Sequence, residues 1–94
     1  MDSLEAKGKR RMTQAGFTAA QCRAARAAVQ WSQDELAERA RVSRATLVKF
    51  ENGSGVPHTN NLTAIRAAFE AEGFRFALSE ADGQASISYV ETWK

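Results

Sequence analysis

Two short stretches with a helical spacing of hydrophobic residues stand close together near the middle of the chain. Leu36 and Ala40 share one face of the first stretch, and Leu47 and Phe50 share one face of the second. The segment between the two stretches is too short for another element or a long loop. We therefore predict two helices within residues 32–53 that fold back across each other.

Both predicted helices begin at a serine that can cap them. Ser32 and Glu35 have the spacing of a capping box, in which the serine hydroxyl accepts from the Glu35 N–H and the glutamate side chain bonds to the Ser32 N–H. Trp31 and Leu36 flank this cap at the spacing of a hydrophobic staple. Ser43 is the corresponding cap of the second helix.

Another helix is predicted before this pair. Thr18 and Gln21 have the spacing of a further capping box, so the helix should run from about residue 19 to Val29. Cys22, the only cysteine, occupies a hydrophobic position on this helix. We interpret Cys22 as a small buried thiol, and the alternative is a redox switch.

A fourth helix is predicted after a loop. Residues 53–59 contain two glycines and the only proline, Pro57, which is typical of a loop. Thr59 or Asn60 then caps a helix that stops at Gly73. The hydrophobic face of this helix carries Leu62, Ile65 and Phe69.

After Gly73 the hydrophobic period changes from helical to alternating. Residues 74–79 and 86–90 both alternate in this way, and Asp82 and Gly83 supply a turn between them. This pattern predicts a β-hairpin. Because an isolated hairpin is marginally stable in water, it must pack on the helices or pair with another chain.

The composition is that of one small domain. The chain has 94 residues, and single domains of about 60 residues already fold alone. It contains no run of roughly 18 apolar residues and no hydrophobic signal segment at its N-terminus. A single cysteine allows no intrachain disulfide. We expect a soluble, cytoplasmic protein with no membrane partner.

The small net charge of +2 is unevenly distributed. Residues 1–56 hold ten Lys and Arg and six Asp and Glu, a net of +4, whereas residues 57–94 hold three and five, a net of −2. The basic half contains the paired helices, as expected where DNA phosphates supply affinity. Its basic run at residues 7–11 lies in a predicted flexible tail over residues 1–16. This tail is either an arm that reaches along DNA or a solvated terminus.

The second of the paired helices has a polar face suited to nucleic acid. The residues near its solvent side or its N-terminal end are Arg44, Ala45, Thr46 and Lys49. Arginine and lysine bond to guanine and phosphates, threonine bonds to bases or phosphates, and alanine packs on the methyl group of thymine. The alternative interpretation is an ordinary solvated helix face.

A family resemblance favours the nucleic-acid interpretation. From about Cys22 to Phe69 the chain resembles the helix-turn-helix of Cro and the lambda-repressor-like (XRE) transcriptional regulators. The resemblance implies a mainly α fold, with a helical DNA-binding domain of about four helices over residues 17–73. The motifs that carry it are WSQ at residues 31–33, ELA at 35–37, VS at 42–43, Thr46 and FENG at 50–53.

The resemblance also implies roles for single positions. Gln33 is expected to contact a phosphate and to brace the second helix, and Asn52 stands where a backbone N–H meets the sugar-phosphate chain. Arg44 is the candidate for bidentate recognition of guanine, and Lys49 for holding a phosphate. The residues expected to touch base edges and nearby phosphates are Ser43, Arg44, Ala45, Thr46 and Lys49.

Three more positions are interpreted through the same resemblance. Arg26 and Glu51 match an ion pair that, in lambdoid repressors, ties the helix before the pair to the end of the DNA-reading helix. We therefore interpret both residues as structural. Arg41 replaces the glycine that the family often has in the turn, where the backbone is left-handed. Arg41 either contacts a phosphate or is a solvated arginine.

The C-terminal third departs from the phage repressors, which usually end in a further helix. Residues 74–94 form a predicted hairpin and a candidate dimerisation element. Pairing of the hairpin edges of two copies would place two DNA-reading helices about 34 Å apart on a palindromic site. The alternative is a monomer whose strands cap its own core.

The sequence thus predicts a sequence-specific double-stranded DNA-binding transcriptional regulator, a repressor that binds a palindromic operator as a homodimer. The alternative is a type II antitoxin that binds a toxin protein and represses its own operon. A third reading is a protein-interaction module without DNA binding. The sequence shows no acid–base pair, nucleophile arrangement or phosphate loop, and its one histidine stands alone. We therefore expect no enzyme activity, no cofactor and no metal site.

Overall fold

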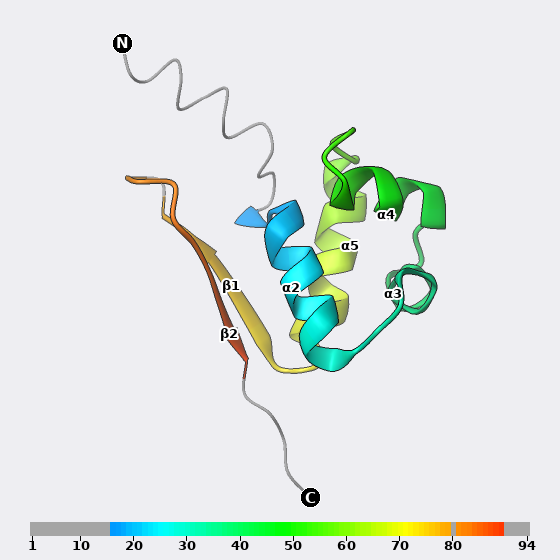
Figure 1. Cartoon of the computed structure of the whole chain (residues 1–94), viewed down its shortest axis with the longest axis horizontal. Helices are drawn as coiled ribbons and strands as arrows, with labels where there is room; N and C mark the ends of the chain where they lie inside the picture. Colours follow the sequence, from blue (N-terminus) through cyan, green and yellow to red (C-terminus); the bar gives the residue numbers. More distant parts are fainter. Residues whose placement is uncertain (1–15, 80, 90–94) are drawn as a thin grey trace, which may run out of the picture.

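The computed structural model describes residues 16–79 and 81–89, which form helices followed by a β-hairpin (Figure 1). The helices are α2 (Ala19–Val29), α3 (Gln33–Ala40), α4 (Arg44–Glu51) and α5 (Thr59–Glu70). Strands β1 (Phe74–Leu78) and β2 (Ala85–Tyr89) pair in antiparallel orientation. The prediction of a mainly α fold with a C-terminal hairpin is confirmed.

Side-chain caps begin α2 and α3. At α2 the predicted capping box is complete: Thr18 Oγ1 accepts from the Gln21 N–H at 3.0 Å, and Gln21 Oε1 accepts from the Thr18 N–H at 2.8 Å. At α3, Ser32 Oγ accepts from the Glu35 N–H at 3.0 Å. Only this half of the second predicted box forms, because the Glu35 carboxylate accepts from Arg39 instead, at 3.1 Å.

The start of α5 differs from the prediction. Neither Thr59 nor Asn60 caps the helix: Thr59 is its first residue, and His58 occupies the N-cap position without a side-chain bond to the helix. The physical reason is that the His58 carbonyl already accepts from the Leu62 N–H at 3.0 Å. The first helical hydrogen bond therefore closes one residue earlier than the pattern of capping side chains indicates.

The hydrophobic core lies between the helices and one face of the hairpin. The Phe69 ring stacks on Trp31 with centroids 5.4 Å apart and meets Phe74 edge-on at 5.5 Å. Phe17 packs edge-on against Phe76 at 4.7 Å. These aromatic pairs combine a large buried area with favourable ring geometry. The other buried hydrophobic residues are Cys22, Ala25, Leu36, Ala37, Ala40, Leu47, Phe50, Leu62 and Ile65.

The hairpin packs against the helices of its own chain. Figure 1 shows it beside α2, on the side opposite α3 and α4. Phe74 lies opposite Tyr89 in the register, and their rings stack with centroids 4.2 Å apart. The buried Gln21 amide donates to the carbonyls of Ala77 at 3.1 Å and Ser86 at 2.8 Å. One side chain therefore joins α2 to both strands.

Some predicted segments fall beyond the described residues. The basic tail over residues 1–16 lies outside them except for Gly16, and so does the end of the hairpin segment, residues 90–94. Within the part of the chain that the structure describes, no helix is long and apolar enough to cross a membrane.

Candidate nucleic-acid interface

A short turn connects α3 to α4. Its first residue, Arg41, has a left-handed backbone with φ of 60°, in the position where glycine is common in the family that the sequence resembles. The Arg41 N–H donates to the Glu38 carbonyl at 3.2 Å, and the Val42 N–H donates to the Ala37 carbonyl at 3.0 Å. The left-handed conformation costs an arginine on the order of 1 kcal/mol. The Arg41 side chain is exposed.

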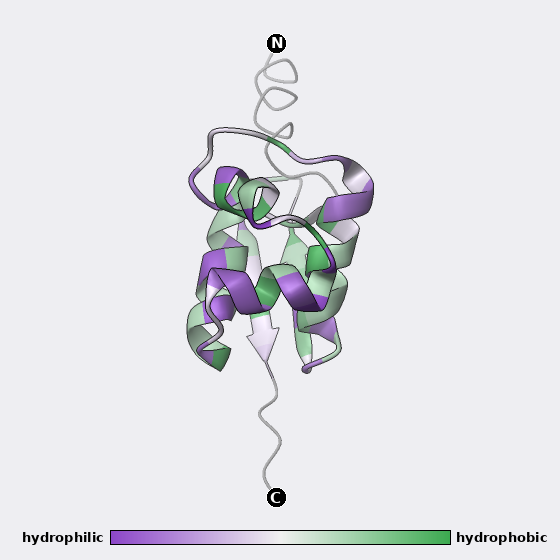
Figure 2. Cartoon of the chain, turned by 90° about the vertical axis from the view of Figure 1, so that its right-hand side faces the viewer, coloured by the Kyte–Doolittle hydropathy of each residue, from purple (hydrophilic) through white to green (hydrophobic). Residues whose placement is uncertain are grey.

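Helix α4 buries one face and exposes the other. Leu47 and Phe50 are buried. In Figure 2 the helices that face the viewer carry both hydrophilic and hydrophobic positions. Ser43 Oγ accepts from the Thr46 N–H at 3.0 Å and donates to Thr46 Oγ1 at 2.8 Å, which fixes the first turn of α4. Of the residues predicted to read bases, Thr46 is half-buried and Ser43, Arg44, Ala45 and Lys49 are exposed.

The Glu51 carboxylate at the end of α4 joins three helices. Arg26 of α2 binds both of its oxygens, with Nε–Oε2 and Nη2–Oε1 distances of 2.9 Å. Gln33 Nε2 of α3 donates to Oε1 at 3.0 Å. The Glu51 side chain is only 3% exposed, so this charge-assisted network holds the α2, α3 and α4 arrangement inside the domain. The three residues of this network, Arg26, Gln33 and Glu51, were all singled out from the sequence.

Cys22 adds a buried thiol to the same carboxylate. Its Sγ donates to Glu51 Oε2 at 3.1 Å. Burial, reinforced by this bond, raises the pKa of the Cys22 thiol far above its ordinary range, so the thiol remains a protonated donor. Burial by itself raises the pKa of Glu51, but the bonds from Arg26, Gln33 and Cys22 outweigh it and hold that pKa below its ordinary value.

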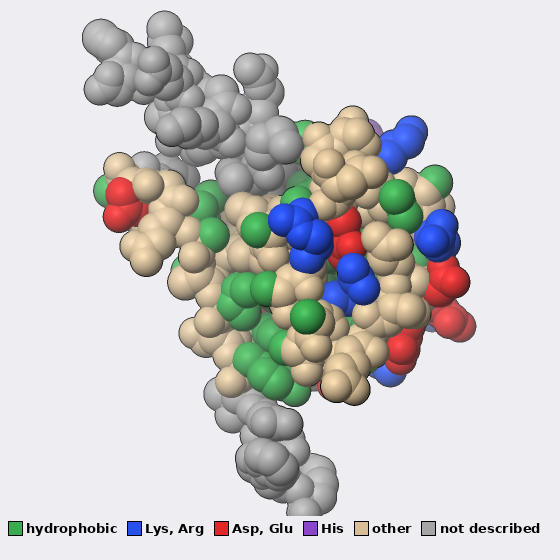
Figure 3. All heavy atoms as spheres, viewed as in Figure 1, with side chains coloured by type: hydrophobic (Ala, Val, Ile, Leu, Met, Phe, Trp, Pro, Cys, Tyr) green, Lys and Arg blue, Asp and Glu red, His purple; other side chains and the backbone are tan. Residues whose placement is uncertain are grey.

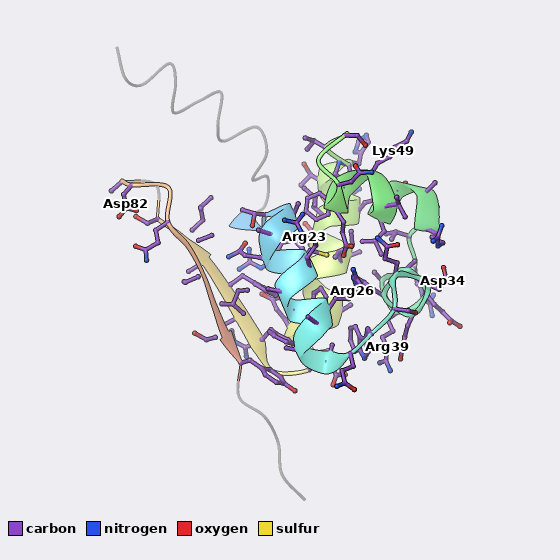
Figure 4. The ribbon with its side chains drawn as sticks, viewed as in Figure 1. Arg23, Arg26, Asp34, Arg39, Lys49 and Asp82 are labelled. Atoms are coloured by element: carbon purple, nitrogen blue, oxygen red, sulfur yellow. The ribbon has the colours of Figure 1, made fainter. Side chains whose placement is uncertain are left out.

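Arg23 is a contributor that the sequence analysis missed. Its Nη1 donates to the main-chain carbonyl of Glu51, so a second arginine of α2 holds the C-terminal end of α4. The sequence could have indicated this contact, because Arg23 precedes Arg26 by three residues and the two therefore lie on the same face of α2. Figure 4 shows both side chains extending from α2 toward α4, whereas Lys49 points outward from α4.

Arg44 has an acidic partner that the sequence analysis also missed. Its Nε lies 2.7 Å from Oδ1 of Asp34 in the first turn of α3. The two side chains are 62% and 76% exposed, so the pair lies at the surface. Ten residues separate the partners, and no spacing rule for a single helix links them.

Asn52 has intrachain partners for both its backbone N–H and its side-chain oxygen. The Asn52 N–H donates to the Val48 carbonyl at 3.0 Å, because the residue completes the last turn of α4. Its Oδ1 accepts from the N–H and the hydroxyl of Ser54, at 2.9 and 2.6 Å. Asn52 is exposed, so its side-chain NH₂ group is a further donor that it can offer to a phosphate.

The face seen in Figure 3 has an uneven charge distribution. Its Lys and Arg side chains all lie over the half formed by the helices, and none lies over the hairpin. A shallow hollow beside α4 is lined by Thr46, Lys49, Gly55, Val56 and Pro57. Asp and Glu side chains lie on the same half, so basic groups that could contact phosphates stand beside acidic ones there.

Comparison with known proteins agrees with this arrangement. A family model described as helix-turn-helix (HTH_3) matches residues 23–72, which include α3, α4, their turn and α5. No curated protein matches the chain. The match spans more than half of the chain and includes every residue singled out above as a DNA contact. The chain belongs to the helix-turn-helix family of Cro and lambda-repressor-like (XRE) DNA-binding transcriptional regulators.

Proposed function

We propose that this regulator is a sequence-specific repressor that binds a palindromic operator as a homodimer and blocks a promoter. The observation that carries the proposal is the exposure of Arg44, Ala45 and Lys49 on a helix whose far end is fixed to α2 and α3 through Glu51. A helix held in this way can enter the major groove, where each base pair presents a distinct pattern of donors and acceptors. We call α4 the reading helix.

The proposed contacts follow from the chemistry of each exposed group. Arg44 donates to guanine, and Lys49 neutralises a phosphate. The Gln33 amide has two N–H bonds: one is used by Glu51, which leaves the second for a phosphate. Ser43, Ala45 and Thr46 complete the base-reading surface, and Arg41 and the Asn52 side-chain amide contact the backbone at its rim.

Selection from randomised duplex DNA, followed by sequencing, tests this function. We expect an enriched motif of two inverted half-sites whose centres lie about 10 base pairs apart. A motif with a single half-site would contradict dimeric binding but retain sequence-specific binding. If no motif is enriched over the starting library, the proposed function is wrong.

The dimer is proposed from the hairpin. Among the described residues the sheet has only two strands, so each strand has one edge without a partner strand. Such edges bind further strands readily, and a symmetric pair of hairpins would close the edge. Analytical ultracentrifugation with and without the selected operator tests this. A monomer at tens of micromolar in both conditions would exclude the dimer.

The second candidate is an antitoxin that represses its own operon. The same two hairpin edges, together with Tyr89, which is 37% exposed, favour it because they offer a surface for another protein away from the reading helix. The product of an adjacent gene that is toxic alone and neutral when co-expressed with this chain would support this candidate. An adjacent product without toxicity would contradict it.

A further inference from the structure

The ion pair between Arg44 and Asp34 lies at the surface, where an ion pair contributes little to the free energy of folding. Both side chains are more than half exposed, and exposed ion pairs add little to folding stability. An acidic residue is also unfavourable on a surface that must approach phosphates. Asp34 lies in the first turn of α3, where a carboxylate is favourable toward the helix dipole, and its pairing with Arg44 comes in addition to that role.

The geometry of the pair leaves the guanine-binding end of Arg44 free. Asp34 Oδ1 lies 2.7 Å from Arg44 Nε, so the carboxylate sits at the inner nitrogen of the guanidinium. The two terminal nitrogens keep their donors, and guanine offers two acceptors, O6 and N7, at its major-groove edge. A guanidinium is planar and rigid, so a carboxylate that attracts Nε also favours the orientations in which the terminal nitrogens point away from Asp34.

We propose that Asp34 is a specificity-determining residue, which positions the guanidinium of Arg44 for guanine and keeps it away from the DNA backbone. This inference rests on the proposed function, in which Arg44 reads a base. An arginine binds phosphate as readily as guanine. The Asp34 carboxylate lies beside Arg44 Nε and repels phosphate, so it disfavours the non-specific contact and favours the specific one.

The test compares selections from randomised duplex DNA for the parent chain, Asp34→Asn and the control Glu38→Gln. Both variants remove one negative charge from α3, so any general gain in DNA affinity from lost repulsion should occur in both. Glu38 is exposed and, within residues 16–79 and 81–89, takes part in no ion pair. Only Asp34→Asn should relax one guanine position, with a fall in preference over the other bases of about 3- to 10-fold.

A double-mutant comparison shows whether Asp34 acts through Arg44. Arg44→Ala identifies the position that Arg44 reads, because it should abolish the preference there. Adding Asp34→Asn to Arg44→Ala should then change nothing further at that position. Thermal unfolding of each variant, followed by circular dichroism, verifies that the domain remains folded.

The outcomes separate this inference from the proposed function. If the parent enriches no motif, the proposed function fails. If the parent enriches a motif that Arg44→Ala relaxes, while Asp34→Asn keeps the guanine preference of the parent, the function holds and the role of Asp34 is wrong. Tighter operator binding by Asp34→Asn with unchanged base preference would show that the ion pair merely masks Arg44, and would equally overturn the inference.

Discussion

Gln33 of α3 and Glu51 of α4 are joined by a hydrogen bond of 3.0 Å between Nε2 and Oε1. Arg26 of α2 holds the same carboxylate through both of its oxygens. The reading helix thus depends on one buried charge for its position relative to two other helices. Substitutions in this network should lower the stability of the fold, and they should weaken DNA binding only as a consequence of that loss.

Replacing Arg26 with methionine should lower the free energy of unfolding by about 3–5 kcal/mol, because Glu51 keeps a buried charge without its cationic partner. Urea unfolding followed by circular dichroism measures this change. Arg44→Met is the matched control, because it breaks an ion pair whose side chains are 62% and 76% exposed. The control should cost at most about 1 kcal/mol. Similar losses in both variants would contradict the structural role of the buried pair.

The lowered pKa of Glu51 predicts a loss of stability in acid. The unfolded chain takes up a proton on Glu51 near the ordinary pKa of 4.5, whereas the folded chain resists it to a lower pH. The stabilisation is therefore complete above about pH 5 and is lost as the pH falls through the folded pKa. Thermal unfolding from pH 7 to pH 3 measures this effect.

Two variants identify the carboxylate responsible for the acid sensitivity. Glu51→Gln should show a smaller loss of stability between pH 5 and pH 3 than the parent. Bonds from Ser79 and Gln84 also lower the pKa of Asp82, which is fully exposed. Asp82→Asn is therefore the control. If Asp82→Asn removes the acid sensitivity and Glu51→Gln does not, the hairpin turn rather than the buried network is its source.

The sequence predicted those features that depend on residues close together in the chain. The cap of α2 joins Thr18 to Gln21, three residues apart, and both of its bonds are present. The same Gln21 bonds to Ala77 and Ser86, which lie 56 and 65 residues away. That contact, like the Arg44–Asp34 pair, exists only because packed elements bring distant positions together. Local periodicity carries no information about it.

Replacing Gln21 with leucine tests the connection between α2 and the hairpin. The change removes the bonds to the Ala77 and Ser86 carbonyls and one half of the α2 capping box. We expect the free energy of unfolding to fall by about 2–4 kcal/mol. Amide exchange in β1 and β2 should also become faster. The control is Gln84→Leu in the exposed turn, which should change stability by no more than about 0.5 kcal/mol.

Replacing Arg44 or Lys49 with alanine separates base reading from phosphate binding. Arg44→Ala should remove the preference at one base-pair position of the selected operator, at a cost of about 1–3 kcal/mol in discrimination. Lys49→Ala should instead weaken binding to all duplexes to a similar degree and reduce the slope of log affinity against log salt by about one. Fluorescence anisotropy with the operator and its single-base variants, at several salt concentrations, measures both effects.

Both residues are exposed, so neither change should unfold the domain. Parental affinity, base preference and salt slope in both variants would show that the reading helix does not contact DNA through this face.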